Sequence, residues 1–373
     1  MFKRYSFIVF LALLVGIVAG CGAAATPTAA PAAPPTTAPA APTAVVAAPT
    51  AVPVAPTAVP VPPTKAPIKL IQSYVPSGNA TQILAAAKDL DKLMTAKTGY
   101  VFESSVATSY AATVEAMCSG KVDIGWLNPL GYVVANNKCG VEGLLLTVRA
   151  QSPSNTCPPG KDVCFTYRAQ IIYNIEKNPE LDKLAKDPKA TNKDKVAALK
   201  GKKFAFGDPL STSGNLYPRD IMLKNGLDPL KDFGEVASLG SHNNVALAVY
   251  KGTVDAGSTF EDVRDGLVKD NPDIKTKTGI LLYSDEIPND AVSVRKDLDP
   301  VVKATFKRAL YELAATDEGK KALDSTYQYY GFADANDKLY DPIRTIAKAI
   351  GLDLEAAIQP KPAAPTATPT KAP

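Results

Sequence analysis

Two short stretches that lie far apart in this chain have nearly the same sequence. Gly-Lys-Val-Asp-Ile-Gly spans residues 120–125, and Gly-Thr-Val-Asp-Ala-Gly spans residues 252–257. In each stretch the first glycine is placed to end a helix, and the apolar residues after it begin a strand. The surrounding sequence predicts the same order of strands and helices around both, which chance does not easily supply. We therefore predict an α/β protein with two lobes that share one plan.

Each half of the chain has the pattern of a parallel sheet with helices on its faces. The first half is predicted to contain strands at 68–74, 101–105 and 122–126, a helix capped by Thr81 and a helix at 110–119. The second half is predicted to contain strands at 203–206, 236–239 and 254–258 and helices at about 212–225 and 243–251. Closing helices are predicted from Pro300, Asp317 and Tyr340. Lobe 1 is expected to comprise about residues 68–169 and 285–358, and lobe 2 about residues 170–284, with the ligand between them.

The beginning of the chain has the pattern of an export signal. Lys3 and Arg4 precede an apolar run over residues 7–18, and small residues lead to Cys21. This pattern predicts a secretory signal over residues 1–20, and the run is shorter than the roughly 20 residues of a membrane span. The cysteine directly after it resembles a bacterial lipoprotein signal, which implies a diacylated Cys21; an ordinary signal peptide with an incidental cysteine is the alternative. We expect an exported protein, lipid-anchored to the cell membrane and facing the periplasm or the cell exterior.

Two segments cannot form a packed core. Residues 22–67 are nearly all Ala, Pro, Thr and Val, with Lys65 as the one charge, and residues 359–373 have a similar composition. Such sequences are extended or disordered. We therefore predict a stalk over 21–67, a solute-binding domain over 68–358 and a disordered tail over 359–373.

Cysteine and charge content restrict the class of protein further. After Cys21 the chain has four cysteines, an even number that indicates disulfides in an exported protein and allows three connectivities. We favour Cys118–Cys139 and Cys157–Cys164, because each pair is the closest in sequence. The chain has a single histidine and no Cys-x-x-Cys, so no metal site is expected. Its formal charge of +4 comes from interspersed basic and acidic residues, which gives no indication of nucleic-acid binding.

The segment over residues 204–214 is the most informative about a ligand. A strand runs into a turn, and Ser211, Thr212 and Ser213 then open a helix. Helix starts carry unpaired N–H groups and partial positive charge, so with added hydroxyl donors they attract oxyanions; a simple helix cap is the alternative. His242 opens another helix of the same lobe, although a lone histidine is more often structural, and Asp290 has the alternative of a turn residue.

At these residues the chain resembles the phosphate-, phosphite- and phosphonate-binding proteins of ABC importers, the phosphonate-binding family. The likeness covers most of residues 68–350 and rests on the segments 207–214, 240–242, 254–257 and 287–290. It implies an α/β, two-lobed periplasmic-binding-protein fold of type 2 with the ligand cleft between the lobes. It also implies a non-enzymatic function as a solute-binding lipoprotein. The expected partners are a small oxyanion and an ABC transporter permease, with no cofactor, and we expect a monomer.

The resemblance implies a set of ligand-binding residues. In the family a Ser-Thr-Ser run and a histidine bind the oxyanion, an acid follows an Ile-Pro turn, and a tyrosine lies near the start of the first lobe's second helix. The matching residues here are Ser211, Thr212, Ser213, His242, Asp290 and Tyr110; Tyr110 has an aromatic helix cap as its alternative.

Two departures from the family concern substrate choice. Leu127 stands where some members have a tyrosine, so one phenol contact is missing. Some members also have a glutamate that recognises an amine on the ligand, and here Glu261 is one residue out of position, so Asp262 could replace it. Loss of that acid would leave phosphonate substrates in doubt, and we favour phosphate or a close analogue.

Other functions remain as alternatives. Residues 293–296 fit the Ser-x-x-Lys of penicillin-binding enzymes, but Lys-Thr-Gly precedes them at 277–279 and no Ser-Asp-Asn follows. The sequence has neither a phosphate-binding Gly-rich loop nor a cluster of metal ligands typical of phosphatases. A two-lobed protein for a sulfonate, thiamine phosphate or an organic acid is a further alternative, and the stalk alone suggests an adhesion module.

Overall fold

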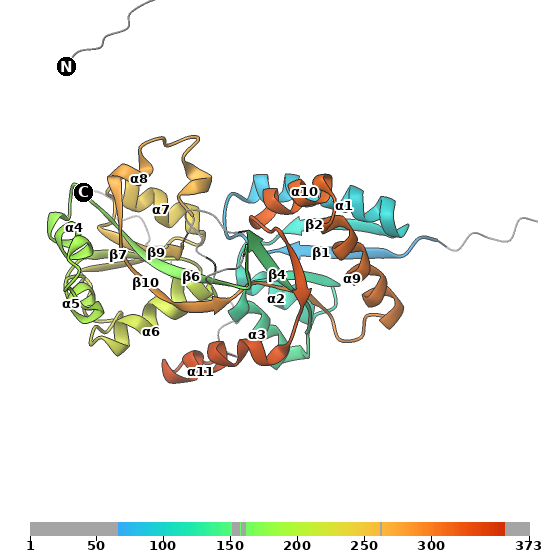
Figure 1. Cartoon of the computed structure of the whole chain (residues 1–373). Helices are drawn as coiled ribbons and strands as arrows, with labels where there is room; N and C mark the ends of the chain where they lie inside the picture. Colours follow the sequence, from blue (N-terminus) through green and yellow to red (C-terminus); the bar gives the residue numbers. More distant parts are fainter. Residues whose placement is uncertain (1–65, 151–156, 158–161, 262, 355–373) are drawn as a thin grey trace, which may run out of the picture. The chain divides into compact units, whose positions relative to one another are not determined.

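The computed structural model describes residues 66–150, 157, 162–261 and 263–354, which form two β-sheets with helices on their faces (Figure 1). The prediction of an α/β protein with two related halves is therefore confirmed. The predicted signal, Cys21, residues 22–65 of the predicted stalk, Asp262 and the tail over 359–373 lie outside the described residues. Within the described part, no helix has the length and apolar character that crossing a membrane requires.

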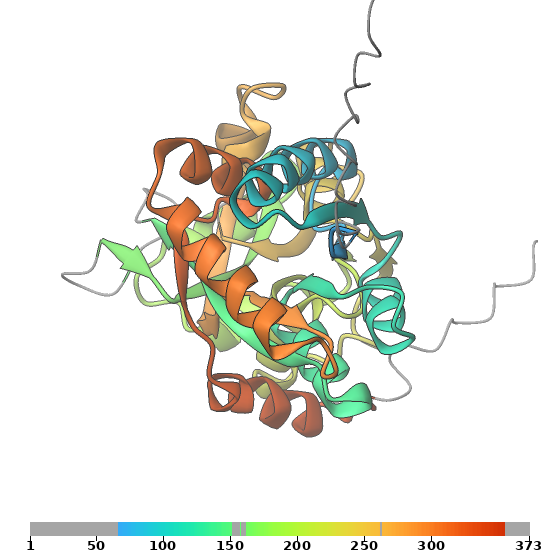
Figure 2. The same cartoon turned by 90° about the vertical axis from the view of Figure 1, so that its right-hand side faces the viewer.

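The first sheet is mixed. Its strand order is β12 (Gly331–Asp334), β4 (Glu142–Ala150), β11 (Ala291–Val294), β3 (Ile124–Leu127), β1 (Lys69–Tyr74) and β2 (Val101–Val106), and β5 (Val163–Cys164) pairs with β4. β1 is parallel to β2 and β3, whereas β11 is antiparallel to β3 and β4. One apolar core joins the sheet to α1 (Ala80–Thr98), α9 (Pro300–Ala314) and α10 (Asp317–Tyr327). Another joins it to α2 (Tyr110–Cys118), α3 (Pro129–Cys139) and α11 (Asp341–Ala349), which follows a short 3-10 helix over Asp337–Tyr340 (Figure 2).

The second sheet has the order β10 (Thr278–Pro288), β6 (Thr166–Asn174), β9 (Ala256–Phe260), β7 (Lys203–Phe206) and β8 (Glu235–Ser238). Strand β7 lies between β8 and β9 and is parallel to both, as β1 is to β2 and β3. Around it lie α4 (Pro179–Lys186), α5 (Asn192–Ala197), the π-helical turn η1 (Thr212–Leu216), α6 (Tyr217–Lys224), α7 (His242–Tyr250), the 3-10 turn η2 (Asp265–Leu267) and α8 (Ile274–Lys277). Strands β6 and β10 pair antiparallel and carry the chain into and out of this sheet.

The repeated hexapeptide has the same role in both sheets. Gly120 and Gly252 both have a left-handed backbone, with φ of 72° and 66°, which glycine adopts without strain. The aspartates that follow, Asp123 and Asp255, each accept a 2.8 Å hydrogen bond from a backbone N–H of the adjacent parallel strand, β1 or β7. The hexapeptide thus ends one helix and fixes the next strand beside β1 or β7.

The last glycine of each hexapeptide allows close packing. A Cβ atom on Gly125 would lie 2.2 Å from the Sδ atom of Met117 in α2, and one on Gly257 would lie 2.5 Å from Val245 in α7. Both distances are shorter than a van der Waals contact. A side chain at either position would therefore force the neighbouring side chains of the helix to shift.

Two helix starts differ from the sequence prediction. The cap of α1 is Asn79 rather than Thr81, because the Asn79 side chain accepts hydrogen bonds from the N–H groups of Thr81 and Gln82. The helix predicted at 212–225 begins as the π-helical turn η1 and becomes α-helical at Tyr217. Pro218 has no N–H, so the Gly214 carbonyl instead accepts from the Gly207 N–H at 2.9 Å and from the Ser258 hydroxyl at 2.7 Å.

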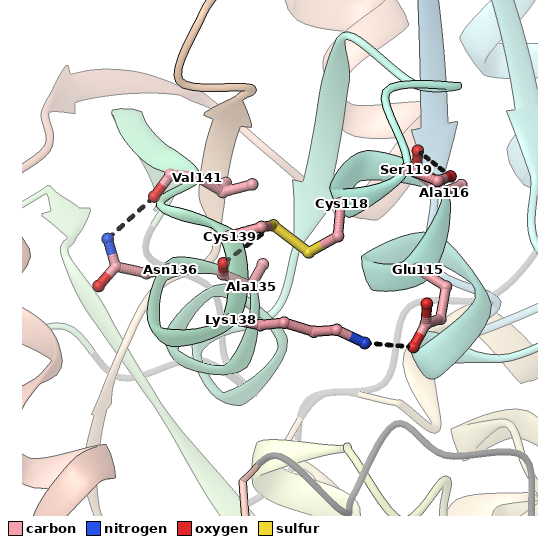
Figure 3. Close-up of a disulfide and its surroundings, with 9 residues drawn as sticks. All are labelled: Glu115, Ala116, Cys118, Ser119, Ala135, Asn136, Lys138, Cys139 and Val141. Carbon is pink, nitrogen blue, oxygen red and sulfur yellow. Dashed lines mark hydrogen bonds and ion pairs between the residues drawn. A yellow bond between two sulfur atoms is a disulfide. The ribbon is translucent and has the colours of Figure 1, made fainter.

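Two disulfides occur in the described part of the chain, Cys118–Cys139 and Cys157–Cys164, the pairs favoured by nearness in sequence. Figure 3 shows the first, which joins the ends of α2 and α3. The ion pair between Lys138 and Glu115, at 2.7 Å, links the same two helices. The opposite ends of these helices reach the cleft described next.

Candidate functional site

A cleft of about 340 Å³ is lined by residues from both sheets and their helices. This volume lies at the lower end of the range for small-molecule pockets, about 300–1,000 Å³. Five of the seven predicted ligand-binding residues line it, namely Tyr110, Ser211, Ser213, His242 and Asp290. Residues that we did not predict also line it, among them Asn128, Arg149, Tyr167, Phe260 and Tyr327.

Ser211 and Ser213 lie where the second sheet's strand β7 leads into η1. Both are buried. The Ser211 hydroxyl accepts from the Gly214 N–H at 2.9 Å and lies 3.1 Å from Nε2 of His242. Gly214 is required here, because a Cβ atom at this position would lie 2.9 Å from the Ser211 hydroxyl and 3.0 Å from the His242 ring. The hydroxyl run is therefore both a helix cap and part of the cleft wall.

Thr212 has a different environment from its two neighbours and is not among the residues that line the cleft. Its hydroxyl oxygen accepts from the side-chain amide of Asn128 and from the N–H of Leu130, each at 2.9 Å. Asn128 also donates to the Leu210 carbonyl at 2.8 Å. These bonds link the start of α3 to η1, and they leave the Thr212 hydroxyl able to act only as a donor toward a further group.

His242 is the first residue of α7, and its ring lies in the cleft wall. Its backbone N–H donates to the Ser77 carbonyl at 2.9 Å, and its ring meets the ring of Phe260 edge-on at 4.9 Å. Burial, with a smaller contribution from the positive charge of Arg149, lowers the pKa of His242 to about 3. The ring is therefore neutral near pH 7. Its Nδ1 atom has no hydrogen-bond partner among the described residues.

Asp290 and Arg149 are two of the charged residues that line the cleft. Asp290 immediately precedes β11, and Arg149 lies near the end of the neighbouring strand β4. Their closest atoms, Oδ2 and Nη2, are 3.9 Å apart, and the Tyr329 hydroxyl donates to the same Oδ2 at 2.9 Å. Burial raises the pKa of Asp290, while the Arg149 charge and the Tyr329 hydrogen bond oppose this rise.

Arg149 was missed from the sequence. Its guanidinium lies over the rings of Tyr167, at 5.4 Å, and Phe260, at 5.7 Å, which come from the second sheet. The residue is only 6% exposed. The available signal was a charged residue near the end of β4, directly after residues 144–148, which are apolar except for Thr147. A buried strand rarely contains a charge without a partner, so that pattern already indicated a functional or paired arginine.

Tyr110 is the first residue of α2, which is capped by Ser109. It is buried, and its backbone N–H donates to Asp208 at 3.3 Å, which links α2 to the loop after β7. Burial, and next the negative charges of Asp208 and Asp290, raises the pKa of Tyr110 well above its ordinary value. Its phenol therefore remains protonated and available to donate.

Glu261 does not line the cleft, contrary to the expectation for an amine-recognising acid. Its carboxylate accepts from the Arg168 N–H at 3.2 Å and from Arg168 Nε at 2.9 Å, and its Oε2 lies 2.8 Å from Nη2. Charge-assisted hydrogen bonds strongly stabilise a buried carboxylate, so its position is set by Arg168 on β6. Asp262, the alternative acid, lies outside the described residues.

Comparisons with known proteins point to one family. The model of the ABC transporter, phosphonate, periplasmic substrate-binding protein family matches residues 73–340. The phosphate-import protein PhnD of Mycolicibacterium smegmatis is 27% identical over 296 residues, 74% of this chain and 84% of that protein. The phosphonates-binding periplasmic protein of Escherichia coli is 27% identical over 261 residues, 70% of this chain and 69% of that protein.

Solved structures show the same fold at lower identity. A binding-protein component of an ABC phosphonate transporter from Pseudomonas aeruginosa has a TM-score of 0.62 at 23% identity, covering 79% of this chain and 89% of that one. PhnD1 from Prochlorococcus marinus, in complex with methylphosphonate, has a TM-score of 0.64 at 19% identity, covering 76% of this chain and 99% of that one. Two lobes of the periplasmic-binding-protein type are thus the fold of this chain.

Proposed function

The chain belongs to the family of periplasmic substrate-binding proteins of phosphonate ABC transporters, and we propose that its ligand is phosphate or a closely related phosphorus oxyanion. This family consists of transport proteins rather than enzymes. Its members act outside the cytoplasm and pass a small ligand to the permease of an ABC importer. The family thus fixes the kind of function, and the residues of the cleft argue for the ligand.

The observation that carries the proposal is the convergence of donors in one cleft. Ser211 and Ser213 at η1, His242 at the start of α7 and Tyr110 at the start of α2 all line it. Helix starts and hydroxyl donors favour an oxyanion, and Arg149 adds a full positive charge. The name of the mycobacterial relative, a phosphate-import protein, supports the same ligand.

Asp290 supports phosphate over sulfate. The last proton of a phosphate-like anion titrates near neutral pH, with a pKa of about 6 for a phosphomonoester, so the site can bind the form that still carries this proton. A carboxylate only accepts hydrogen bonds, so Asp290 would accept the bond from that proton. Sulfate has no such proton and would place oxygen against oxygen in a poorly solvated cleft.

The proposal is tested by titrating the protein, freed of bound ligand by unfolding and refolding, with phosphate, phosphite, methylphosphonate and sulfate in a calorimeter. We expect tight binding of at least one phosphorus oxyanion and much weaker binding of sulfate. A ligand that binds the folded state also raises the melting temperature, which gives a second readout. Binding of sulfate alone, or of none of the four, would overturn the proposal.

Lipid anchoring and the monomeric state complete the proposal. The basic start, apolar run and small residues before Cys21 support cleavage at that cysteine and its acylation. Mass spectrometry of the mature N-terminus should find acyl chains on Cys21, and Cys21→Ser should release the protein or leave it uncleaved. An unmodified N-terminus on the wild type would refute the anchor. Sedimentation should give a monomer.

A further inference from the structure

The carboxylate of Asp290 is held through one of its two oxygens. Oδ2 accepts the hydrogen bond from the Tyr329 hydroxyl at 2.9 Å and lies 3.9 Å from Nη2 of Arg149. Within the part of the chain that the structure describes, no hydrogen bond reaches the other oxygen, Oδ1. Asp290 lines the cleft, whereas Tyr329 is not among the lining residues. Oδ1 is therefore the oxygen that remains for a ligand.

Tyr329 is itself fixed by its neighbours. It lies between α10 and β12 and is only 1% exposed. Its ring stacks on the ring of Trp126, with centroids 6.0 Å apart, and meets the ring of Tyr327 edge-on at 5.4 Å. Its hydroxyl has a single proton, which it donates to Asp290. A phenylalanine at this position keeps the ring contacts and removes only the donor.

We infer that Tyr329 is a positioning residue for selectivity: it holds Asp290 so that one acceptor oxygen, Oδ1, meets the ligand. This inference rests on the proposed function and deepens it, since the ligand then presents one protonated oxygen to the site. A phosphorus oxyanion with one P–OH group satisfies that acceptor, whereas sulfate has no proton to offer. A carboxylate without the Tyr329 bond is free to turn away from sulfate, which relieves the repulsion.

The charged and titratable groups around Asp290 come from several elements. Arg149 on β4 is a permanent cation. The others are phenols whose pKa is raised above the ordinary value, chiefly by burial, so they stay protonated near neutral pH: Tyr110, Tyr167, Tyr327, Tyr329 and Tyr340. Burial raises the pKa of Asp290, and the Arg149 charge and the Tyr329 hydrogen bond oppose this rise. Loss of the Tyr329 hydroxyl therefore raises the pKa of Asp290 further.

The experiment compares the binding of phosphate, methylphosphonate and sulfate by calorimetry near pH 7. In Tyr329→Phe the affinity for the phosphorus oxyanion relative to sulfate should fall by about tenfold, the effect of one hydrogen bond to a charged group. Tyr340→Phe is the matched control. The Tyr340 hydroxyl is equally buried and donates to the Asn289 carbonyl at 3.2 Å, beside Asp290 but not to its carboxylate, so this variant should keep the wild-type ratio.

Sulfate binding from neutral to acidic pH is a second readout, which altered packing alone would not move. Sulfate affinity should rise as Asp290 gains a proton, because a carboxylic acid can donate to sulfate. Since the pKa of Asp290 is higher without the Tyr329 donor, this rise should begin at a higher pH in Tyr329→Phe than in the wild type or in Tyr340→Phe.

A double variant tests whether Tyr329 acts through Asp290. Asp290→Asn already removes the carboxylate, so the addition of Tyr329→Phe to it should change the ratio no further. If Tyr329→Phe alone unfolds because the buried carboxylate has lost its donor, the double variant should fold, which shows the same dependence.

Four results would overturn the inference. These are a wild-type ratio and pH dependence in Tyr329→Phe, an equal change in Tyr340→Phe, a double variant that fails to fold or changes the ratio further, and a wild type that binds sulfate as tightly as the phosphorus oxyanions. Failure of the wild type to bind any phosphorus oxyanion would instead overturn the proposed function.

Discussion

The two sheets contribute different chemistry to one cleft. The second sheet provides neutral donors at helix starts, Ser211, Ser213 and His242, whose positions follow from contiguous turns of the chain. The first sheet provides the charged pair of Arg149 and Asp290, which come from neighbouring antiparallel strands. We propose that the neutral donors attract any tetrahedral anion, whereas the charged pair distinguishes one anion from another. Affinity and selectivity are therefore expected to respond to different substitutions.

The largest effect is expected from removing the disulfide that links the two helices α2 and α3 on the first sheet. Cys118–Cys139 joins the far ends of α2 and α3, whose near ends carry Tyr110 and Asn128. For a sequence separation of 21 residues, Cys118→Ala with Cys139→Ala should lower the free energy of unfolding by about 3 kcal/mol. Urea unfolding measures this loss.

The second disulfide is the control for that prediction. Cys157–Cys164 spans a sequence separation of 7 residues, so its removal should cost about 1 kcal/mol less than removal of the first. If the two double variants lose equal stability, or the variant without Cys157–Cys164 loses more, the disulfide between α2 and α3 is not the one that stabilises the fold more.

The next effect concerns the second sheet's donors. Ser213→Ala should weaken phosphate and methylphosphonate alike by about tenfold to a hundredfold, because a hydrogen bond to a charged group contributes about 1.5–3 kcal/mol. Ser105→Ala is the control, since that hydroxyl donates to the Gln72 carbonyl in the first sheet and does not line the cleft. Wild-type affinity in Ser213→Ala would show that Ser213 only shapes the turn.

A pH prediction tests whether the second sheet's donors are neutral. The folded-state pKa of His242 is lowered to about 3, below the ordinary value of about 6.5. Between these values the unfolded chain binds more protons at this residue, so its contribution to stability is complete above about pH 6.5 and is lost as the pH falls toward 3. From pH 7 to pH 5 the wild type should lose about 2 kcal/mol more than His242→Asn.

Urea unfolding at both pH values provides the measurement. Titration of Asp290 and other carboxyl groups is common to the two proteins, so their difference isolates the histidine. An equal loss in the two proteins would mean that the pKa of His242 is not lowered in the folded state. The ring would then become a second cation in the cleft as the pH falls to 5, and the contrast between a neutral and a charged side would be lost at that pH.

The same contrast explains what the sequence could and could not predict. Ser211, Ser213 and His242 were found because a strand, a turn and a helix start are local signals, and local backbone geometry places all three. The repeated hexapeptide predicted the two halves for the same reason. Pro218 has no N–H, and its position in the sequence indicates that the helix cannot start regularly. The hydroxyl that donates to the Gly214 carbonyl instead lies on another strand, which local sequence does not show.

Arg149 and Glu261 show the limit of prediction from local sequence. Arg149 enters the cleft because β4 pairs with β11 and because two rings of the other sheet close over it, and no local pattern contains those pairings. Glu261 turns away from the cleft because Arg168, 93 positions earlier in the chain, holds its carboxylate. Charges are placed by long-range partners, so the charged side of the site is the part that sequence alone predicts least well.

The smallest expected effect is the sharpest test of the comparison, and it concerns Asp290. Asp290→Asn should lower phosphate affinity less than it raises sulfate affinity, which should increase by about tenfold, because an amide can donate to sulfate where a carboxylate repels it. Since burial raises the pKa of Asp290, acidification should protonate it earlier than an ordinary carboxyl group, and the wild type should then approach the variant in its sulfate affinity. Calorimetry with both anions at neutral and acidic pH measures this, and Ser213→Ala, which should weaken both anions equally, is the control. If the wild type already binds sulfate as tightly as phosphate at neutral pH, the charged pair selects nothing, and the two sheets contribute only to affinity.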